Sequence, residues 1–407
     1  MAKNIIIAGA GPSGMCAAIA AARDGASVTV IEKNDTVGKK LSMTGNGRCN
    51  LSNLRMSADE FNENSRDRMK KWLSLFGVKD TLNFFKSLGV VVMSEDGYLY
   101  PISGQAKTVT QALYNECLRL GVSFIFSEQL KSIAKNSEVF NVKTSKNEYE
   151  ADAVIVAVGG LAGPGTTMST GDGYYICEKL GMTKKDTYPA LCSLVTDDDS
   201  ISGDFGIRMN ARASFLIGDG VFATEEGEVQ ITKNSLSGIP IMQSSGLVCY
   251  HLSKNRPVTV SIDFFPEYTD EEFEALVDDM LSLAHDRRLK DLLLGFCNQG
   301  ITDLILGRMK LSPDMKVKNV GESMLRCVLQ KYRDVRFNIV KTADYKKAQV
   351  TRGGISLGDL DDNLMCVKSP GVFVIGELCD VDGRCGGYNL QWAWCSGYIA
   401  GGAASCL

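Results

Sequence analysis

The start of the chain carries the feature that most constrains its fold, a glycine-rich turn between a strand and a helix. Residues 4–8 are an apolar run typical of a buried strand, and Gly9, Gly11 and Gly14 follow in the spacing G-x-G-x-x-G. The first glycine allows a tight turn, the second lets the backbone approach a pyrophosphate, and the third lets the helix pack on the strand. The pattern predicts a dinucleotide site at the helix N-terminus, where free N–H groups attract phosphate.

The residues after this turn complete the unit. Residues 15–25 are alanine-rich and predict a helix that ends at Gly25, and residues 27–33 predict a second strand with Glu32 at its carboxyl end. Glu32 follows Gly11 by about 20 residues, the separation at which an acid accepts hydrogen bonds from ribose hydroxyls. The acid disfavours a 2′-phosphate in this site, so these residues leave FAD and NAD as alternatives.

Composition narrows the class of protein. The chain has 407 residues, of which 44% are apolar and 23% charged, enough for two or three globular domains. The net charge of −4 argues against a dedicated nucleic-acid binder. Thirteen cysteines without a C-x-x-C pair and only two histidines, His251 and His285, argue against a metal site, and residues 197–199 are typical of a turn.

The cysteine usage also indicates a reducing compartment with free thiols. Residues 5–22 are apolar enough to resemble a membrane span, but their glycines, proline and strand-like start favour a buried βα unit. We therefore expect a cytoplasmic protein without a membrane span.

Segments later in the chain indicate which of the two cofactors, FAD or NAD, binds. A strand over residues 151–160 ends in Gly159 and Gly160, a junction that lets the backbone pass close to a bound cofactor. Another buried strand, residues 372–376, precedes Gly386, Gly387 and a helix from Asn389 onward. A helix N-terminus beside a flavin stabilises negative charge on the reduced ring, which NAD does not require, so this end of the chain favours FAD.

Residues 190–350 have a different pattern. Strand candidates at 191–198, 207–217, 228–233 and 258–264 precede helical stretches at 269–285, 287–296, 301–308 and 320–332. The order predicts an inserted domain of strands followed by a small helical bundle.

Five long motifs support a family resemblance. They read GAGPSG, GKKLSMTGNGRCNLSN (38–53), TGDGY, TRGGISL (351–357) and GELCDVDGRCGGYNLQWAWCSGYIAGG. Together they resemble the HI0933-like family of bacterial FAD-dependent oxidoreductases, also called BaiN-type or aminoacetone-oxidase-like, over nearly the whole chain.

The resemblance implies an α/β fold: a glutathione-reductase-like Rossmann FAD-binding domain with an inserted β-barrel-like domain and a small helical subdomain. We expect the FAD-binding domain at 1–189 and 351–407, the β-rich domain at 190–268, and the helical subdomain with a return strand at 269–350.

The glycine patterns and the resemblance together imply the residues that bind FAD. They are Gly9, Gly11, Pro12, Ser13, Gly14, Glu32, Lys33, Lys40, Gly45, Asn46, Gly47, Arg48, Cys49, Asn50, Ala157, Gly159, Gly160, Gly376, Glu377, Asp382, Gly386, Gly387, Tyr388, Asn389 and Leu390. The chain has Glu377 where related flavoproteins often carry Asp, so Asp382 is a rival for the contact to the ribityl chain. It also has Ser235 where the family tends to have glycine.

Three residues are candidates for catalysis: Arg48, Tyr388 and Asn389. Arg48 can pair with the pyrophosphate, which offers bidentate acceptors, or meet an anionic substrate or hydride donor. Tyr388 and Asn389 can contact a substrate carbonyl or the flavin edge, or serve as a packing aromatic and an N-cap. For Cys49, which has no nearby partner cysteine in the sequence, apolar filler is favoured over a reactive thiol.

The family resemblance predicts an NAD(P)H-linked oxidoreductase that acts on CH–CH groups. Hydride from N5 of reduced FAD would reduce an activated C=C bond of a hydrophobic oxo substrate, such as a bile-acid or steroid enone. One alternative is an oxidase of small amines that uses O₂. Another is a flavin-binding module that acts on RNA or a protein partner, although the acidic net charge favours no nucleic-acid partner. The sequence does not indicate the oligomeric state.

Overall fold

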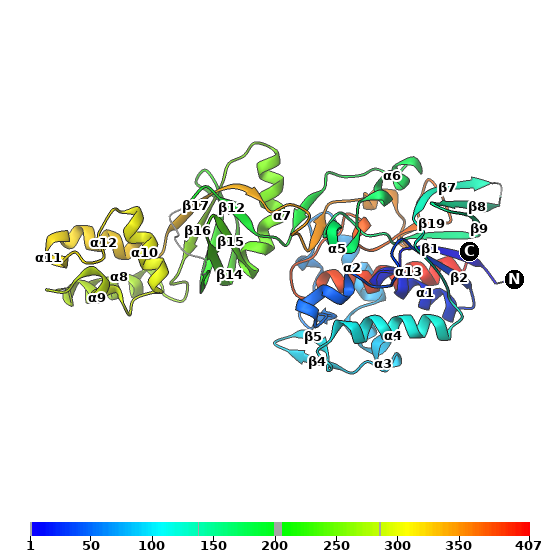
Figure 1. Ribbon diagram of the computed structural model, residues 1–407, viewed down its shortest axis with the longest axis horizontal. Helices are drawn as coiled ribbons and strands as arrows, with labels where there is room; N and C mark the ends of the chain where they lie inside the picture. The colour runs from blue at the N-terminus through cyan, green and yellow to red at the C-terminus, as the bar shows by residue number, and fades with distance from the viewer. Residues whose placement is uncertain (1, 137, 199–205, 285) are drawn as a thin grey trace. The chain divides into compact units, whose positions relative to one another are not determined.

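The computed structural model describes residues 2–136, 138–198, 206–284 and 286–407, and Figure 1 shows the order of its elements. His285 and Asp199, about which the sequence made predictions, lie outside the described residues. The chain divides into two compact units. One comprises Met1–Tyr188 and Gln349–Leu407, and the other comprises Pro189–Ala348.

A parallel five-stranded sheet is the centre of the first unit. Its strands run in the order β19 (Val372–Val374), β10 (Ala153–Val156), β1 (Asn4–Ala8), β2 (Ser27–Glu32) and β6 (Ser123–Phe126). In register, Ile5 of β1 pairs with Ala153 on one side and Val28 on the other. The near-continuous apolar runs follow from burial of the sheet on both faces. The strand predictions at both ends of the chain are confirmed.

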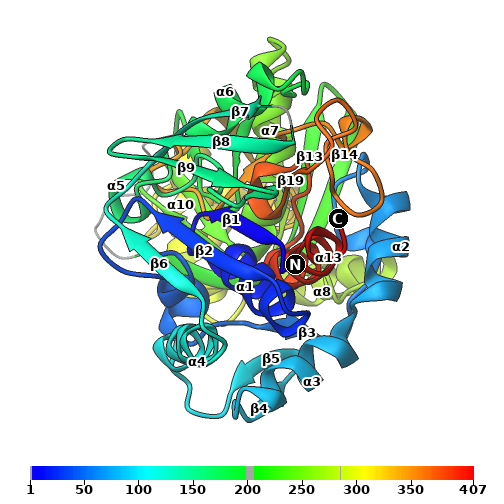
Figure 2. The same cartoon turned by 90° about the vertical axis from the view of Figure 1, so that its right-hand side faces the viewer.

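Helices cover one face of this sheet and a small antiparallel sheet covers the other, as Figure 2 shows. The helices are α1 (Pro12–Arg23), α4 (Ala106–Arg119) and α13 (Tyr388–Ser405). The antiparallel sheet contains β7 (Leu130–Asn136), β8 (Val139–Thr144) and β9 (Glu148–Ala151).

Two glycines bring α13 against α1. A Cβ at Gly397 would lie 2.4 Å from the carbonyl oxygen of Ser13, and one at Gly401 would lie 2.4 Å from that of Ala17. Since successive turns meet in the same order, the helices run side by side in the same direction. The N-terminus of α13, at Tyr388, therefore extends past that of α1 by about 12 Å along the axis.

Residues 54–106 form a subregion for which the sequence made no prediction. It contains α2 (Arg66–Leu75), α3 (Val78–Ser87), β4 (Val92–Glu95) and β5 (Tyr98–Pro101). The preceding strand β3 (Ser52–Asn53) joins them in a sheet of order β3, β5, β4. Trp72 of α2 packs on Trp392 of α13, with ring centroids 5.0 Å apart, so the subregion shares the core of the first unit.

A closed barrel forms the core of the second unit. Its strands follow the order β12 (Leu194–Thr196), β15 (Ser235–Gly238), β14 (Gly220–Thr232), β13 (Ile207–Ile217), β16 (Val258–Asp263) and β17 (Val335–Thr342). The strand at 207–217 is confirmed, whereas β14 begins well before the predicted residue 228. The helix α7 (Ile239–Ser253) packs on the barrel and was not predicted.

The helices of the second unit are α8 (Asp270–Ser282), α9 (Leu289–Leu293), α10 (Gln299–Arg308), α11 (Val317–Val320) and α12 (Glu322–Lys331). A capping box starts α8, because Thr269 accepts from the N–H of Glu272 and the Glu272 carboxylate accepts from that of Thr269. The barrel and these helices confirm the predicted fold class.

Candidate functional site

The glycine turn after β1 has the geometry of a phosphate cradle. Gly9 has φ +108°, and a Cβ there would lie 2.4 Å from the carbonyl oxygen of Ala157. A Cβ at Gly14 would lie 1.9 Å from the carbonyl oxygen of Gly9, whereas one at Gly11 would meet no atom within 4 Å. The first and third glycines are thus required by the fold, and the second leaves open space beside the start of α1.

The N-terminus of α1 faces this open space. Gly11 is the N-cap and has no side chain to satisfy the N–H groups of the first turn, and Pro12 is the first helical residue. Ser13 is buried, and its hydroxyl lies 2.6 Å from where a Cβ at Gly376 would stand. Free N–H groups and the helix dipole suit this position to an anion.

Glu32 is buried at the end of β2, and its carboxylate orders the neighbouring turns. One oxygen accepts from the backbone N–H of Ala10 (2.7 Å), and the other accepts from the N–H of Asn34 (2.9 Å) and from its amide (2.7 Å). A carboxylate has about four acceptor sites, so capacity remains for a ribose hydroxyl. The Oδ1 atom of Asn34 is buried without a hydrogen-bond partner, and sequence reasoning missed this residue.

The loop that begins at Gly38 adopts a backbone that few residue types tolerate. Gly45 and Gly47 have φ +57° and +84°, and the non-glycine residues Asn46 and Cys49 have φ +54° and +62°. A Cβ at Gly45 would lie 3.0 Å from the backbone nitrogen of Asn50. The glycines and asparagine of this loop therefore allow two consecutive tight turns, after which Asn50 is buried.

Arg48 lies on the outer side of this loop. Its guanidinium donates to Glu95 (2.5 Å) and lies 4.2 Å from the ring centroid of Tyr100. This ion pair raises the pKa of Arg48 and lowers the pKa of the Glu95 carboxyl. The structure thus brings Arg48 to the β4–β5 hairpin, and pairing with a pyrophosphate stays a prediction.

Cys49 is fully buried, and burial raises the pKa of its thiol to about 12. A thiol with such a pKa is almost entirely protonated at neutral pH, so it is a poor nucleophile. The geometry agrees with the filler role that the sequence favoured.

The start of α13 forms the second helix N-terminus of the site. Gly387, with φ +97°, is its N-cap and provides no side-chain cap. A Cβ at Gly387 would lie 2.5 Å from the carbonyl oxygen of Ser52 and 2.8 Å from Oδ1 of Asn50. That Oδ1 is buried without a hydrogen-bond partner, so an unsatisfied acceptor lies beside an uncapped helix start.

The two other candidates on this helix have structural contacts. The Asn389 amide donates to the carbonyl oxygen of Gly383 (2.7 Å), and its Oδ1 accepts from the N–H of Gly383 (2.9 Å). Tyr388 packs edge-on against Phe61, and burial raises the pKa of its hydroxyl. Leu390 is half-buried. Asn389 thus fixes the preceding loop, and roles for these residues in catalysis stay predictions.

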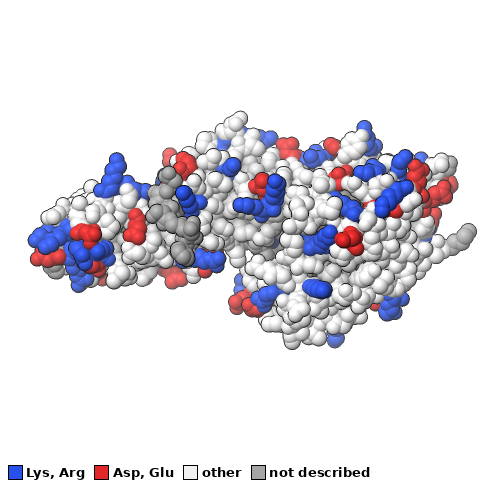
Figure 3. Space-filling view, in the orientation of Figure 1, with Lys and Arg blue, Asp and Glu red and all other residues white. Residues whose placement is uncertain are grey.

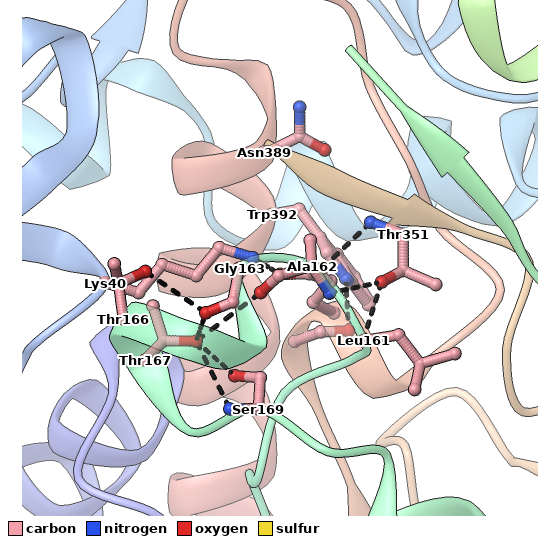
Figure 4. Close-up of polar contacts among 12 residues, drawn as sticks. Lys40, Leu161, Ala162, Gly163, Thr166, Thr167, Ser169, Thr351, Asn389 and Trp392 are labelled. Carbon is pink, nitrogen blue, oxygen red and sulfur yellow. Dashed lines mark hydrogen bonds and ion pairs between the residues drawn. The ribbon is translucent and has the colours of Figure 1, made fainter. Parts of the chain in front are cut away.

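A polar cluster links four distant segments of the chain (Figure 4). Lys40 pairs with one carboxylate oxygen of Glu377, and the other accepts from the N–H of Thr351 (2.9 Å). The Thr351 hydroxyl accepts from the N–H groups of Leu161 (2.8 Å) and Ala162 (3.2 Å). Glu377 is therefore engaged by the protein, and Thr351 is a site residue that the sequence analysis missed.

Close packing explains the glycines of this cluster. A Cβ at Gly160 would lie 2.6 Å from Oγ1 of Thr351, Gly159 has φ +75°, and Ala157 is buried. Lys33, also predicted at the site, donates to Thr170 (3.2 Å) and contacts Asp172 (3.4 Å).

Asp382 belongs to a separate buried polar group. Its carboxylate accepts from Arg352 (3.2 Å) and from the amide of Asn62 (2.6 Å), which also donates to Asp380 (3.2 Å). Burial raises the pKa of both aspartates, and Arg352 opposes the effect. A ribityl contact by Asp382 stays a prediction, and Asp380, Asn62 and Arg352 are neighbours that sequence reasoning did not find.

These features fit FAD. A cradle without Cβ atoms and a free helix start suit the pyrophosphate, and a buried acid with an unpartnered amide oxygen suits the adenosine end. About 12 Å further along, a second uncapped helix start with the Asn50 acceptor suits the flavin. The hydrogen-bond donors at the two helix starts and the acceptors Glu32, Asn34 and Asn50 thus match both ends of one extended dinucleotide.

The comparison with known sequences decides the family. Residues 3–403 match the HI0933-like protein Rossmann domain. The chain belongs to the HI0933-like family. A 3-dehydro-bile acid Δ4,6-reductase of Clostridium scindens is 33% identical over 406 residues, 99% of each chain. A ribosomal RNA dihydrouridine synthase of Escherichia coli is 27% identical and covers 97% of this chain and 96% of its own.

Solved structures show the same fold. A 3-ketosteroid Δ1-dehydrogenase of Sterolibacterium denitrificans aligns with TM-score 0.54 at 11% identity, over 100% of this chain and 99% of its own. A 3-ketosteroid Δ4-(5α)-dehydrogenase of Rhodococcus jostii aligns with TM-score 0.51 at 15% identity, over 99% and 97%. This HI0933-like chain is an FAD-dependent oxidoreductase. Among the helices in the described part of the chain, none combines the length and apolar character of a membrane span.

Proposed function

We propose that this protein reduces a C=C bond conjugated to a carbonyl group in a hydrophobic oxo substrate of the bile-acid or steroid class, with NAD(P)H as the electron donor. The observation that carries the proposal is the end-to-end similarity to the bile-acid reductase, at 33% identity over 99% of each chain. The FAD site described above supplies the redox chemistry that such a reaction needs.

FAD, when bound, supplies hydride transfer to and from organic substrates. The residues of this chain would bind and orient it. The N–H groups at the start of α13 favour negative charge in their vicinity, and the Asn50 side chain adds a polar contact beside them. Gly45, Gly386 and Gly387, all with positive φ and close protein neighbours, fix the backbone around this helix start.

A second candidate function follows from the RNA-modifying relatives. The name dihydrouridine synthase describes reduction of the C5=C6 bond of uracil, which is also conjugated to a carbonyl. Both relatives therefore support the same bond type on different substrates. In the second unit, however, several cations lie in ion pairs: Arg326 contacts Glu274 (3.0 Å), and Arg288 contacts Asp291 (2.7 Å). On the face shown in Figure 3, basic and acidic side chains intermingle. RNA binding favours an unpaired basic surface, so we rank the steroid class first.

The test is anaerobic spectroscopy of the purified protein. NADH or NADPH should bleach the flavin absorbance, and a 3-oxo-4-ene steroid should restore it with formation of the saturated ketone. Bleaching by small amines but not by nicotinamides would support the amine-oxidase alternative and overturn the proposal. Reoxidation by a uridine-containing rRNA fragment, but not by the steroid, would establish the RNA alternative.

A further inference from the structure

The β4–β5 hairpin presents an unusual face to solvent. Residues directly opposite each other on antiparallel strands point to the same side, and the register pairs Met93 with Tyr100 and Glu95 with Tyr98. Val91 and Ile102 extend this face, joined by a backbone hydrogen bond of 2.8 Å. We call this set of six residues the hairpin face.

Much of the hairpin face is both apolar and exposed. Val91 is 62% exposed, Ile102 64% and Met93 38%. The alternate residue Leu99 points to the opposite side and is buried at 3% exposure. The hairpin thus has a packed side that fixes it to the protein and a second apolar side with little cover, which is a feature of binding surfaces.

The hairpin face adjoins the candidate flavin site at two points. The ring of Tyr98 lies 2.6 Å from where a Cβ at Gly386 would stand, one residue before the N-cap of α13. The ring of Tyr100 lies 3.5 Å from where a Cβ at Gly45 would stand, and Gly45 abuts Asn50. Tyr98 and Tyr100 therefore join the hairpin face to the candidate flavin site.

One cation lies on this face. Arg48 stacks over Tyr100 and is paired with Glu95, and the two side chains are 41% and 51% exposed. Exposed ion pairs contribute little to stability, so Arg48 can exchange Glu95 for another anion at small cost. Its planar guanidinium suits a carboxylate and stacks on an aromatic ring at the same time.

We propose that the hairpin face binds the apolar body of the substrate and that Arg48 leaves Glu95 to pair with an acidic end group on it. This inference rests on the proposed function and names its substrate more closely: a rigid apolar molecule that carries a carboxylate. Charge complementarity favours this occupant, because a carboxylate can pair with the exposed guanidinium of Arg48 and a neutral steroid cannot.

Binding and turnover are tested with two matched ligands, a 3-oxo-4-ene steroid that bears a side-chain carboxylate and its methyl ester. Arg48→Met keeps an unbranched apolar side chain but removes the charge. It should reduce the preference for the acid over the ester about tenfold in kcat/KM, chiefly through KM. Glu95→Gln removes the competing carboxylate and should lower KM for the acid. Lys143→Met is the matched control, since Lys143 and Glu148 form an exposed ion pair (3.1 Å) on the β8–β9 hairpin of the same unit.

A second arm measures binding without turnover. Equilibrium dialysis with the fully saturated steroid acid should give a weaker Kd for Arg48→Met, and Val91→Ser with Ile102→Ser should weaken binding of acid and ester alike. If Arg48→Met affects acid and ester equally, or changes only the KM for the nicotinamide, the proposal is wrong. If the wild type reduces neither steroid, the proposed function is wrong, whereas dialysis still decides whether the hairpin face binds such an acid.

Discussion

Lys40 and Glu377 form an ion pair although 337 residues separate them in the chain. Glu377 also accepts from the backbone N–H of Thr351, a residue with no exposed surface. One carboxylate therefore joins the loop after β2, the segment that returns from the second unit, and the segment that leads to α13. This arrangement assigns Glu377 a structural role and leads to the first prediction.

Glu377→Ala should lower the free energy of unfolding by about 1–3 kcal/mol, because it leaves the buried N–H of Thr351 without an acceptor. Glu377→Gln keeps that acceptor and loses only the ion pair to Lys40, whose side chain is 30% exposed. The free energy of unfolding of Glu377→Gln should therefore fall by less than about 1 kcal/mol. Urea denaturation of both variants measures the difference, and equal losses would show that the ion pair, rather than the Thr351 contact, is the important interaction.

Gly11→Val should separate folding from cofactor binding. Its backbone has an ordinary φ of −81°, and a Cβ there meets no protein atom, so the variant should fold with nearly unchanged thermal stability in the cofactor-free form. The added side chain fills the space beside the start of α1, so purified protein should lack visible flavin absorbance.

Two other glycines serve as references for this experiment. Gly307→Val, at an exposed position in α10 with open space around its Cβ, should retain FAD. Gly9→Ala should lose both the cofactor and much of its stability, because φ +108° and the 2.4 Å approach to Ala157 exclude a Cβ. A coloured Gly11→Val protein would contradict the assignment of this turn to the pyrophosphate.

Asn50→Leu should have opposite effects on the two forms of the protein. Its Oδ1 is buried and unsatisfied, so an apolar side chain of similar size should leave the FAD-free form as stable as the wild type or about 1 kcal/mol more stable. If that oxygen contacts FAD, the same change should weaken FAD binding by about tenfold. Thermal melting of the cofactor-free protein and fluorescence titration with FAD provide the two measurements. Destabilisation of the free form together with unchanged FAD affinity would refute the assignment.

The sequence predicted those parts of the site that depend on local spacing. Gly9, Gly11 and Gly14 revealed the cradle because each has a distinct steric task within one βαβ unit. The start of α13 was found because Gly386 and Gly387 precede a long run of small residues. The contacts of Glu377, Arg48 and Thr351 could not be predicted, because they join segments that only the tertiary fold brings together.

Two regions of secondary structure were also missed for physical reasons. The helix α7 reads IPIMQSSGLVCYHLS, with apolar and small residues around its circumference, so it lacks the apolar stripe that identifies a surface helix. In α2, charged residues dominate, and only Met69 and Trp72 are buried. Both helices are stabilised by tertiary packing and not by a local sequence pattern: α7 packs on the barrel and α2 on α13.

Cys49 should be chemically inert despite its place in the loop of the candidate site. With the pKa of its thiol near 12, about one molecule in 10⁴ carries the thiolate at pH 8. Iodoacetamide should modify the exposed Cys327 and Cys406 first and reach Cys49 only in denaturant, as mass spectrometry of peptides would show. Cys49→Ala should retain flavin reduction by NAD(P)H, and its loss with intact FAD binding would revive a redox role for the thiol.

Glu116 should make stability depend on pH in the acidic range. Hydrogen bonds from Arg119 (2.7 Å), and secondarily from Arg23 (2.8 Å), lower the pKa of this carboxyl from 4.5 to about 2 against the effect of burial. Since the folded state holds the proton less tightly than the unfolded state, this contribution is present above pH 4.5 and is lost as the pH falls toward 2. The Arg119 side chain is 67% exposed, so solvent screening reduces the contribution to about 1–2 kcal/mol.

Glu116→Gln should therefore flatten the pH dependence of the urea midpoint between pH 4.5 and 2 relative to the wild type. Glu148→Gln, which removes an exposed ion pair with Lys143, should leave this pH dependence nearly unchanged. An unaltered acid transition in Glu116→Gln would show that Arg23 and Arg119 do not hold this carboxylate in solution.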